Sequence, residues 1–220
     1  RCLNYYKCEE QIIYRICHFV SRQALNIDGL GEKQIRFLWS NNIIKNVDDI
    51  FSLKKKHDLY QIDLYNYDGW GERSVNNLFK SIEKSSVVSF DKFIYSLGIR
   101  HVGKELASNL IKNFKNIEKL IEAFSINNDK NIPHCDGLGE IIIKSLKSFF
   151  SSNENLKLIN NLINILDISY KRNTVDDIYH EKKIVITGSF EGHSRNDIED
   201  KLKLLGGKIS HSISKNTDFL

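Results

Sequence analysis

A short segment that begins and ends with glycine occurs four times along this chain and constrains its fold more than any other feature of the sequence. Gly29-Leu30-Gly31, Gly69-Trp70-Gly71 and Gly137-Leu138-Gly139 share one pattern, and Gly98 to Gly103 (GIRHVG) is a longer variant. We name them corners 1 to 4 in chain order, so that the long variant is corner 3. Glycine adopts positive φ angles and lets backbones approach closely, so each corner predicts a tight reversal between two helices. We expect the backbone to turn sharply and to meet phosphate at Gly71, so that valine there would cost both fold and binding.

The residues around the corners carry a helical period. Val102, Leu106, Leu110 and Phe114 are spaced four apart and predict one apolar stripe on a helix. The stretches between successive corners leave room for two helices each, so we predict a mainly α domain of tandem helical hairpins. The other predicted helices cover residues from about 9 to 25, 140–150 and 153–166.

The pattern changes toward the C-terminus. Residues 169–181 are polar without a period, which predicts a linker. The β-branched run 182–187 predicts a buried strand, residues 195–205 a helix, and residues 208–213 a second strand. This β-α-β order predicts the start of a separate α/β domain.

The helix after each corner begins with backbone N–H groups that have no partner inside the helix, and its dipole favours an anion there. Lys33, Arg73 and Lys104 follow the last glycine within two positions, whereas corner 4 has Glu140 and Ile141 and should bind more weakly. A single Gly-x-Gly connection ordinarily binds nothing, but four in series predict contact with DNA phosphates across the minor groove, without sequence preference. The predicted DNA-binding residues are Gly29, Gly31, Lys33, Gly69, Gly71, Arg73, Gly98, Gly103, Lys104, Gly137 and Gly139.

Composition narrows the class of partner. A net charge of +4 permits a nucleic-acid partner without requiring one. No apolar run approaches the ~20 residues of a membrane span, and no signal peptide is recognised. The chain starts at Arg1 and contains no Met, so we expect it to be an excerpt of a longer protein. Its few, unevenly placed cysteines favour a reduced cytosolic setting.

The segments CHFVSRQALNIDGLGEKQI, YDGWGERSVNNLFKSIEKS and FIYSLGIRHVGKELASNL, in this order, strongly resemble the C-terminal half of bacterial NAD-dependent DNA ligases. The resemblance covers nearly the whole chain. It implies a mainly α fold: half of a zinc finger with a connecting helix in residues 1–25, a four-motif helix-hairpin-helix domain in 26–168, a linker in 169–181, and the first part of an α/β BRCT domain in 182–220.

Cys2 and Cys8 are the candidate metal ligands. Their C-x5-C spacing is a weak zinc signal, since two thiolates cannot fill a tetrahedral site and two ordinary cysteines fit it as well. The resemblance implies that they are the second pair of a four-cysteine zinc finger whose first pair lies upstream of Arg1. For Cys17, His18 and Cys135 we expect packing roles.

No residue of the chain is predicted to be catalytic. Ligases of the resembled family use a lysine in a K-x-D-G motif, but the residues two positions ahead of the Asp-Gly pairs here are Asn26, Asn66 and His134. The resemblance therefore implies that NAD and magnesium are bound upstream and that these 220 residues are inactive alone.

The implied partner is double-stranded nicked DNA, held by a monomer in the bacterial cytoplasm near the nucleoid during replication and repair. The Thr187-Gly188 turn of the BRCT segment is either a phosphate contact, as in some BRCT domains, or only the end of a strand, and that domain could also bind a protein. The alternative to a ligase is a non-enzymatic repair scaffold with the same DNA-binding and BRCT modules.

Overall fold

The computed structural model describes residues 8–67, 69–125, 132, 137–170, 179, 182–188, 195–214 and 217–220. The chain forms two compact units, which we call unit 1 (Arg1–Tyr170) and unit 2 (Lys171–Leu220). None of the helices in these ranges is long and apolar enough to cross a bilayer.

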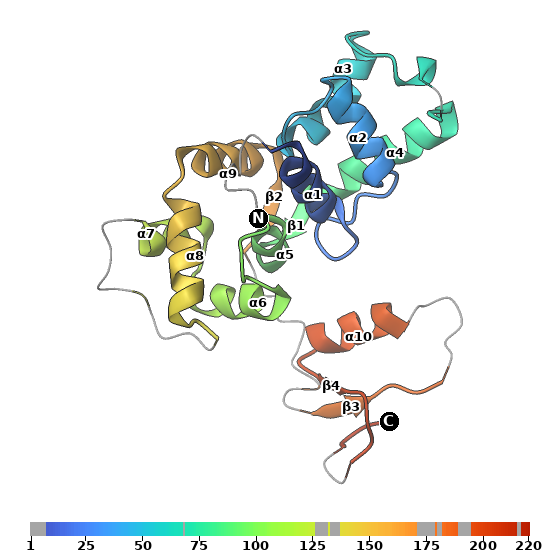
Figure 1. Ribbon diagram of the computed structural model, residues 1–220. Helices are drawn as coiled ribbons and strands as arrows, with labels where there is room; N and C mark the ends of the chain where they lie inside the picture. The colour runs from blue at the N-terminus through green and yellow to red at the C-terminus, as the bar shows by residue number, and fades with distance from the viewer. Residues whose placement is uncertain are drawn as a thin grey trace. The chain divides into compact units, whose positions relative to one another are not determined.

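Unit 1 is built almost entirely from helices (Figure 1), as the sequence predicts. Two short stretches, η1 and η2, are 3-10 helices, and two three-residue strands complete the unit. In chain order its elements are α1 (Glu9–Val20), α2 (Glu32–Ser40), η1 (Asp48–Ser52), α3 (Leu53–Asp58), η2 (Leu64–Asn66), α4 (Glu72–Ser85), β1 (Val87–Ser89), α5 (Phe90–Ser96), α6 (Lys104–Asn113), α7 (Ile117–Phe124), α8 (Glu140–Phe150), α9 (Asn153–Ile165) and β2 (Asp167–Ser169).

The helices form because their apolar residues recur with the helical period and meet in one core. In α4, Val75, Leu78, Phe79 and Ile82 are buried and lie on one face, while the opposite face is charged or polar. The same core takes side chains from every other helix of unit 1, so the hairpins are one packed body.

The first predicted helix is shorter than expected. Its pattern suggested a helix to about residue 25, but α1 ends at Val20 because Ser21 leaves the helical conformation (ψ 155°). The chain then folds back on the helix end: the Leu25 N–H donates to Phe19 O, and Asn26 adopts a left-handed φ of 54°. The turn after α1 is itself buried, so it also contains apolar residues such as Leu25. These residues extend the helical spacing of apolar positions beyond the real end of the helix.

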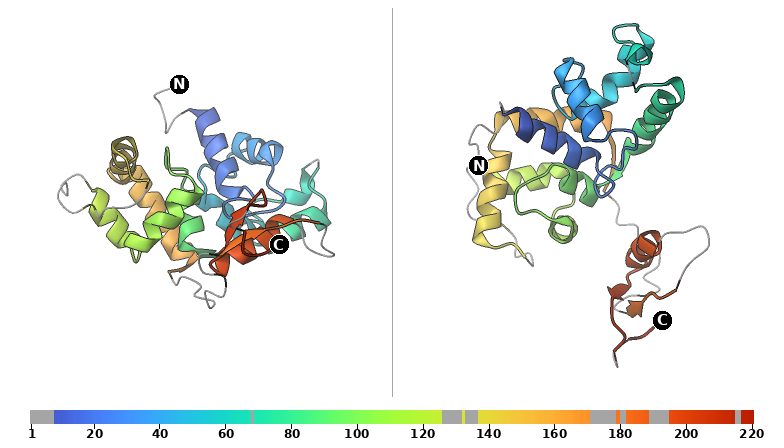
Figure 2. Two further views of the ribbon diagram at one scale, coloured as in Figure 1. Left: turned by 90° about the horizontal axis from the view of Figure 1, so that it is seen from below. Right: turned by 45° about the vertical axis from the view of Figure 1, so that its right-hand side comes forward.

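The views in Figures 1 and 2 show α1–α4 gathered on one side of unit 1 and α5–α8 on the other. Helix α9 runs back toward the first group, where Asn161 Nδ2 donates to Asp48 Oδ2 of η1 at 2.8 Å. Strand β2 pairs in parallel with β1, with Val88 opposite Ile168. The sequence did not predict these strands, because three residues carry no readable period and the partners are far apart in the chain.

Unit 2 has the predicted β-α-β order: β3 (Lys183–Val185), α10 (Arg195–Leu204) and β4 (Lys208–Ser210), with the two strands parallel. Gly206 ends α10 with a φ of 87°. A Cβ on Gly207 would lie 2.7 Å from Ile184 Cδ1 and 3.0 Å from Leu202 O, so a larger residue there would force one of these atoms to move. The second strand is shorter than predicted, since Ile213 is 69% exposed and has no core to face.

Candidate nucleic-acid interface

Each corner combines one left-handed glycine with one extended glycine. The first glycines, Gly29, Gly69, Gly98 and Gly137, have φ of 91°, 81°, 65° and 84°. The last glycines have ordinary extended backbone, such as φ −71° and ψ 157° at Gly71, and each is the N-cap of the next helix. The expectation that the chain turns sharply at Gly71 is therefore wrong, because the left-handed residue lies two positions earlier, at Gly69.

An apolar side chain between or beside the glycines fixes each corner to the core. Leu30, Trp70 and Val102 are 5%, 6% and 6% exposed, and Leu138 is half-buried against the same core. Their burial leaves the backbone of the last glycine on the surface, since Gly31, Gly71, Gly103 and Gly139 are all exposed. The corner is thus anchored inward by its side chain and presented outward by its backbone.

The helices that begin at the corners have no side-chain cap. Neither α2, α4, α6 nor α8 has a hydrogen bond from an N-cap side chain, because the N-cap is glycine. Two α-helices of unit 1 do have a side-chain cap: Asn116 accepts from Lys119 N in α7, and Ser152 accepts from Asn155 N in α9. The first-turn N–H groups after the corners can therefore receive an outside acceptor such as a phosphate oxygen.

Glycine at the last corner position is not required by packing in three of the four corners. An added Cβ on Gly71, Gly103 or Gly139 would meet no heavy atom within 4 Å, and the backbone there suits any residue. At corner 1, a Cβ on Gly31 would lie 3.0 Å from the Gln34 side chain. The open space at these helix N-termini is what close approach of a ligand needs.

Charged residues of both signs surround the helix starts. Lys33, Arg73 and Lys104 are exposed, as predicted for phosphate contact. Each first turn also holds one glutamate, whose negative charge interacts favourably with the helix dipole but repels a phosphate. The neighbouring lysine or arginine must offset this repulsion. Corner 3 adds exposed Arg100 and His101, which the sequence reasoning did not select although both lie between its glycines.

The corners pack in pairs. A Cβ on Gly29 of corner 1 would lie 3.5 Å from Leu78 Cβ, in the helix that follows corner 2. The Asp28 N–H of corner 1 donates to Ser81 Oγ of the same helix at 2.7 Å. A Cβ on Gly137 of corner 4 would lie 3.7 Å from Leu106, in the helix that follows corner 3. Corners 1 and 2 are therefore held at a fixed spacing, and so are corners 3 and 4.

His18 ties corner 3 to the first helix. Its Nε2 lies 2.8 Å from Tyr95 O, and its ring meets the Tyr95 ring edge-on at 4.8 Å. A Cβ on Gly98 would lie 3.3 Å from His18 Cδ2. The role of His18 is therefore packing, as expected, and it positions a corner rather than a metal.

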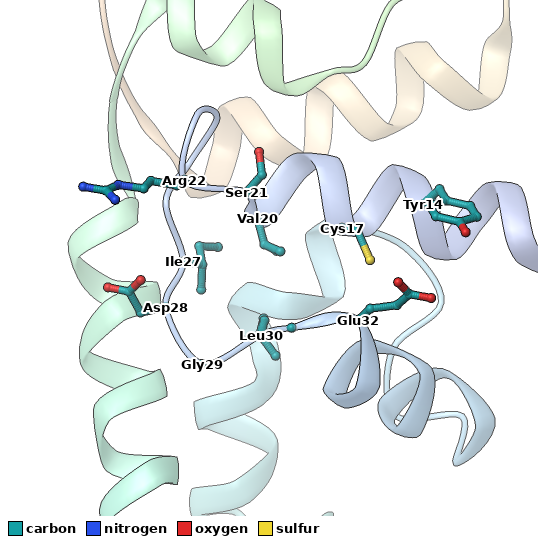
Figure 3. A pocket seen from close by; sticks show the side chains of 11 residues that line it. Tyr14, Cys17, Val20, Ser21, Arg22, Ile27, Asp28, Gly29, Leu30 and Glu32 are labelled. Atoms are coloured by element: carbon teal, nitrogen blue, oxygen red, sulfur yellow. The ribbon is translucent and has the colours of Figure 1, made fainter. Parts of the chain in front are cut away.

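An open hollow of about 340 Å³ lies between α1 and corner 1 (Figure 3). The Cys17 sulfur and the Glu32 carboxylate face this space from α1 and α2. Burial, and then the charge of Glu32, raise the pKa of the Cys17 thiol above its usual value. A raised pKa reduces the thiolate fraction, which disfavours a role of Cys17 as a nucleophile.

An ion-pair network joins α1 to α2 beside the same corner. Arg36 donates to both oxygens of Glu10 at 2.8 and 2.7 Å and to Glu32 at 2.9 Å. The hydrogen bond from Arg36 holds the pKa of Glu10 below its usual value. Because these groups are exposed, the network orients the two helices and contributes little to stability.

Of the two candidate metal ligands, only Cys8 lies in the described part of the chain. It is the N-cap of α1, half-buried and free of any disulfide. Across the described ranges, no three His, Cys, Asp or Glu side chains come together as a metal cluster. Cys2 and Cys135 lie outside those ranges, as do Asp68, His134 and Asp136.

Gly71 and Gly69 offer a test of this geometry. Gly71→Ser should supply the missing cap, because serine is a good N-cap, and stability should be unchanged or rise by a few tenths of a kcal/mol. Its hydroxyl then competes with a phosphate, so anion or DNA affinity should fall. Gly69→Val should instead destabilise unit 1 by about 1–3 kcal/mol, since a β-branched residue disfavours a φ of 81°.

Urea denaturation followed by circular dichroism, with DNA titrations on the same two variants, separates the roles. If Gly71→Ser destabilises the fold as much as Gly69→Val, the corner geometry described above is incorrect.

Comparison with known proteins agrees with this architecture. A family model described as a helix-hairpin-helix motif matches residues 92–159, and one described as a BRCA1 C Terminus (BRCT) domain matches residues 174–220. The chain is 39% identical to a DNA ligase of Wolbachia pipientis subsp. Culex pipiens (strain wPip), a match that covers 100% of the chain and 34% of the ligase.

Other DNA ligases match equally well. The ligase of Ehrlichia ruminantium (strain Welgevonden) is 42% identical, and that of Rickettsia prowazekii (strain Madrid E) is 40% identical; each match covers 100% of the chain and 33% of the ligase. The chain thus spans about a third of the length of the curated relatives it matches. These matches confirm the expected resemblance to the C-terminal part of bacterial DNA ligases, with a mainly α fold and a BRCT domain.

Proposed function

We propose that this chain, which belongs with the bacterial DNA ligases by its sequence, is the part with which such a ligase holds nicked double-stranded DNA. The observation that carries the proposal is the set of four corners. Each presents an exposed glycine and a helix N-terminus without a side-chain cap, and three have an exposed base within two residues. The matches to ligases along the chain favour this function over that of a non-enzymatic scaffold.

The corners suit phosphates better than bases. The first-turn N–H groups donate to a phosphate oxygen, and Lys33, Arg73 and Lys104 supply the positive charge beside it. Contacts of this kind hold a duplex in a fixed orientation and read no sequence. The paired packing through Leu78 and Leu106 would keep neighbouring contacts at a constant spacing along the backbone. Corner 4 has the exposed, uncharged Ile141 where the other corners have a lysine or an arginine, so it would contribute least.

The chemical step of sealing would take place outside these 220 residues. A parent ligase would activate the DNA end with an adenylyl group from NAD, with magnesium, on a lysine that this chain does not supply. The residues described here would bind and orient the nick. The proposed setting is the bacterial cytoplasm, at the nucleoid, with the protein acting as a monomer.

Zinc would join this part to the rest of such a ligase. Cys8 is placed at the first turn of α1 with a half-exposed thiol, which suits a ligand at the edge of a small finger. With Cys2 it would supply two of the four thiolates of a structural site, and the other two would come from outside the chain.

The proposed domain limits are residues 1–25, 26–168, 169–181 and 182–220. In the last of these, Gly188 has a φ of 89° and Thr187 is exposed, a turn that a phosphate or a protein partner could contact.

The proposal predicts salt-dependent binding of duplex DNA of any sequence. Log affinity should fall linearly with log salt, with a slope of about −0.9 for each phosphate neutralised. Arg73→Ala, Lys33→Ala and Lys104→Ala should each lower affinity about three- to tenfold and make the slope smaller by about 1, with little change in stability. Fluorescence anisotropy with labelled nicked duplexes of unrelated sequence at several salt concentrations measures both quantities.

Lys112→Ala and Lys115→Ala are matched controls, since both lysines are exposed; Lys112 lies in the last turn of α6 and Lys115 just after it, at the opposite end from corner 3. They should leave affinity nearly unchanged. A strong preference for one sequence, a flat salt response, or equal losses in the control variants would overturn the assignment of the corners.

A further inference from the structure

The segment from α3 to η2 exposes two aromatic rings, an aliphatic side chain and two lysines. Tyr60 is 92% exposed, Leu59 56% and Tyr65 44%. Lys54 and Lys55 are exposed, and neither forms an ion pair with any residue in the described ranges. Figure 1 shows α3 at the outer end of the α1–α4 side of unit 1. We call these five residues the α3 patch: Lys54, Lys55, Leu59, Tyr60 and Tyr65.

The backbone at Tyr60 repeats a turn found after α2. There the Asn42 N–H donates to Trp39 O, and the next two N–H groups donate to Leu38 O. After α3 the Tyr60 N–H donates to His57 O, and the next two N–H groups donate to Lys56 O. The φ angles agree as well, 56° at Asn42 and 54° at Tyr60. The two helices therefore end in the same left-handed turn.

Only the second of these turns carries a bulky residue at the left-handed position. Glycine and asparagine are favoured there, because a larger L side chain crowds the backbone. Burial of the ring does not offset that cost in Tyr60, since the side chain is almost fully exposed. The ring therefore adds no buried contact to the fold, and a strained residue of this kind is a reasonable place to look for a binding role.

His57 joins the end of α3 to η2 and α4. The Leu64 N–H of η2 donates to His57 Nδ1 at 3.4 Å, and the His57 ring meets Tyr65 edge-on at 4.6 Å. On its other side His57 packs on Phe79 of α4 at 5.4 Å. The α3 patch therefore belongs to the same packed helices as corner 2, which lies between η2 and α4 in the chain.

The charge of the patch favours an anion. The Nζ of Lys56 donates a hydrogen bond to Ile43 O within the chain, at 3.2 Å. Lys54 and Lys55 are therefore the lysines that could contact a ligand. The exposed acid nearby is Asp58, and the carboxylate of Asp63 is engaged by the Tyr65 N–H and by Asn66. Two such lysines beside an exposed ring are the combination that binds a single nucleic-acid strand.

We propose that the α3 patch binds a single DNA strand, with Tyr60 stacked on an unpaired base and Lys54 and Lys55 on the neighbouring phosphates. An intact duplex hides the faces of its bases, so an exposed ring is useful only where a strand is unpaired. The inference rests on the proposed function, because the unpaired strand would belong to the DNA that the corners hold.

The test compares two labelled DNAs with the 220-residue chain: a blunt duplex, and the same duplex with a single-stranded overhang of about ten nucleotides. The overhang should raise affinity about tenfold. Tyr60→Gly should remove that gain and keep the fold, since glycine suits the left-handed turn. Tyr60→Phe should retain the gain, because the ring remains.

The lysines are tested by Lys54→Gln combined with Lys55→Gln. This double substitution should reduce the salt dependence of overhang binding by about 0.7 for each phosphate that is no longer neutralised. The pair Lys112→Gln and Lys115→Gln removes the same charge elsewhere and should not alter the overhang gain.

The outcomes separate this proposal from the proposed function. Duplex binding that needs Arg73, with an overhang gain that survives Tyr60→Gly, overturns the α3 patch alone. An overhang gain that needs Tyr60, with duplex binding insensitive to Arg73 and Lys33, overturns the role of the corners alone. Absence of binding to both DNAs overturns both.

Discussion

Trp70→Ala is expected to lower the free energy of unfolding of unit 1 by about 3–5 kcal/mol. Trp70 is 6% exposed and lies between the two glycines of corner 2, with its ring 6.0 Å from that of Phe37 of α2. Its backbone N–H donates to Tyr67 O at 3.1 Å, and the Tyr67 ring packs edge-on against Phe37 at 4.8 Å. Alanine would leave a cavity between α2 and α4 and free the corner to move.

The unfolding transition can be followed by circular dichroism in urea, because α1–α9 belong to unit 1 and only α10 to unit 2. Affinity for nicked DNA should fall in the same variant, since the helix N-terminus at Gly71 loses its anchor. Tyr14→Ala is the control: that side chain is 59% exposed, and its loss should change stability by no more than about 0.5 kcal/mol. A loss below about 1 kcal/mol for Trp70→Ala would show that the anchor is dispensable.

In the proposed parent ligase, Cys8→Ser is expected to abolish the proposed stoichiometric zinc binding. A structural zinc needs four ligands, and its binding energy of about 10–16 kcal/mol is folding energy, so one missing thiolate should loosen the whole finger. Nick sealing should fall with the zinc content. Transfer of the adenylyl group from NAD to the enzyme should survive, because that step is proposed to occur in another part of the protein.

Cys17→Ser is the matched control, because it makes the same change within the same helix. Cys17 packs against the core of unit 1, so its replacement should leave the zinc content intact. Metal analysis of both variants, with separate adenylation and sealing assays, tests each step. Full zinc occupancy in the Cys8→Ser enzyme, or loss of zinc in the Cys17→Ser enzyme, would refute the assignment.

The sequence by itself determined where the corners lie and that helices flank them. Glycine marks a turn through the conformations of its own backbone, and the stripe of Val102, Leu106 and Leu110 marks a helix through spacing within a few residues. Both features depend only on residues that are close in sequence, so they can be recognised without knowledge of the fold. The basic residues that follow the corners could be selected for the same reason, because a helix start fixes which residues stand at its first turn.

Only the tertiary structure decided which glycine of each pair takes the left-handed conformation and how the corners are arranged. Gly69 rather than Gly71 reverses the chain because Trp70 must point into the core, and that core is made by residues distant in sequence. The pairing of β1 with β2 and the contact of Gly29 with Leu78 likewise join segments far apart in the chain. Exposure of the Tyr60 ring is also a tertiary result, because an apolar residue in a sequence is expected inside until the fold shows that no neighbour covers it.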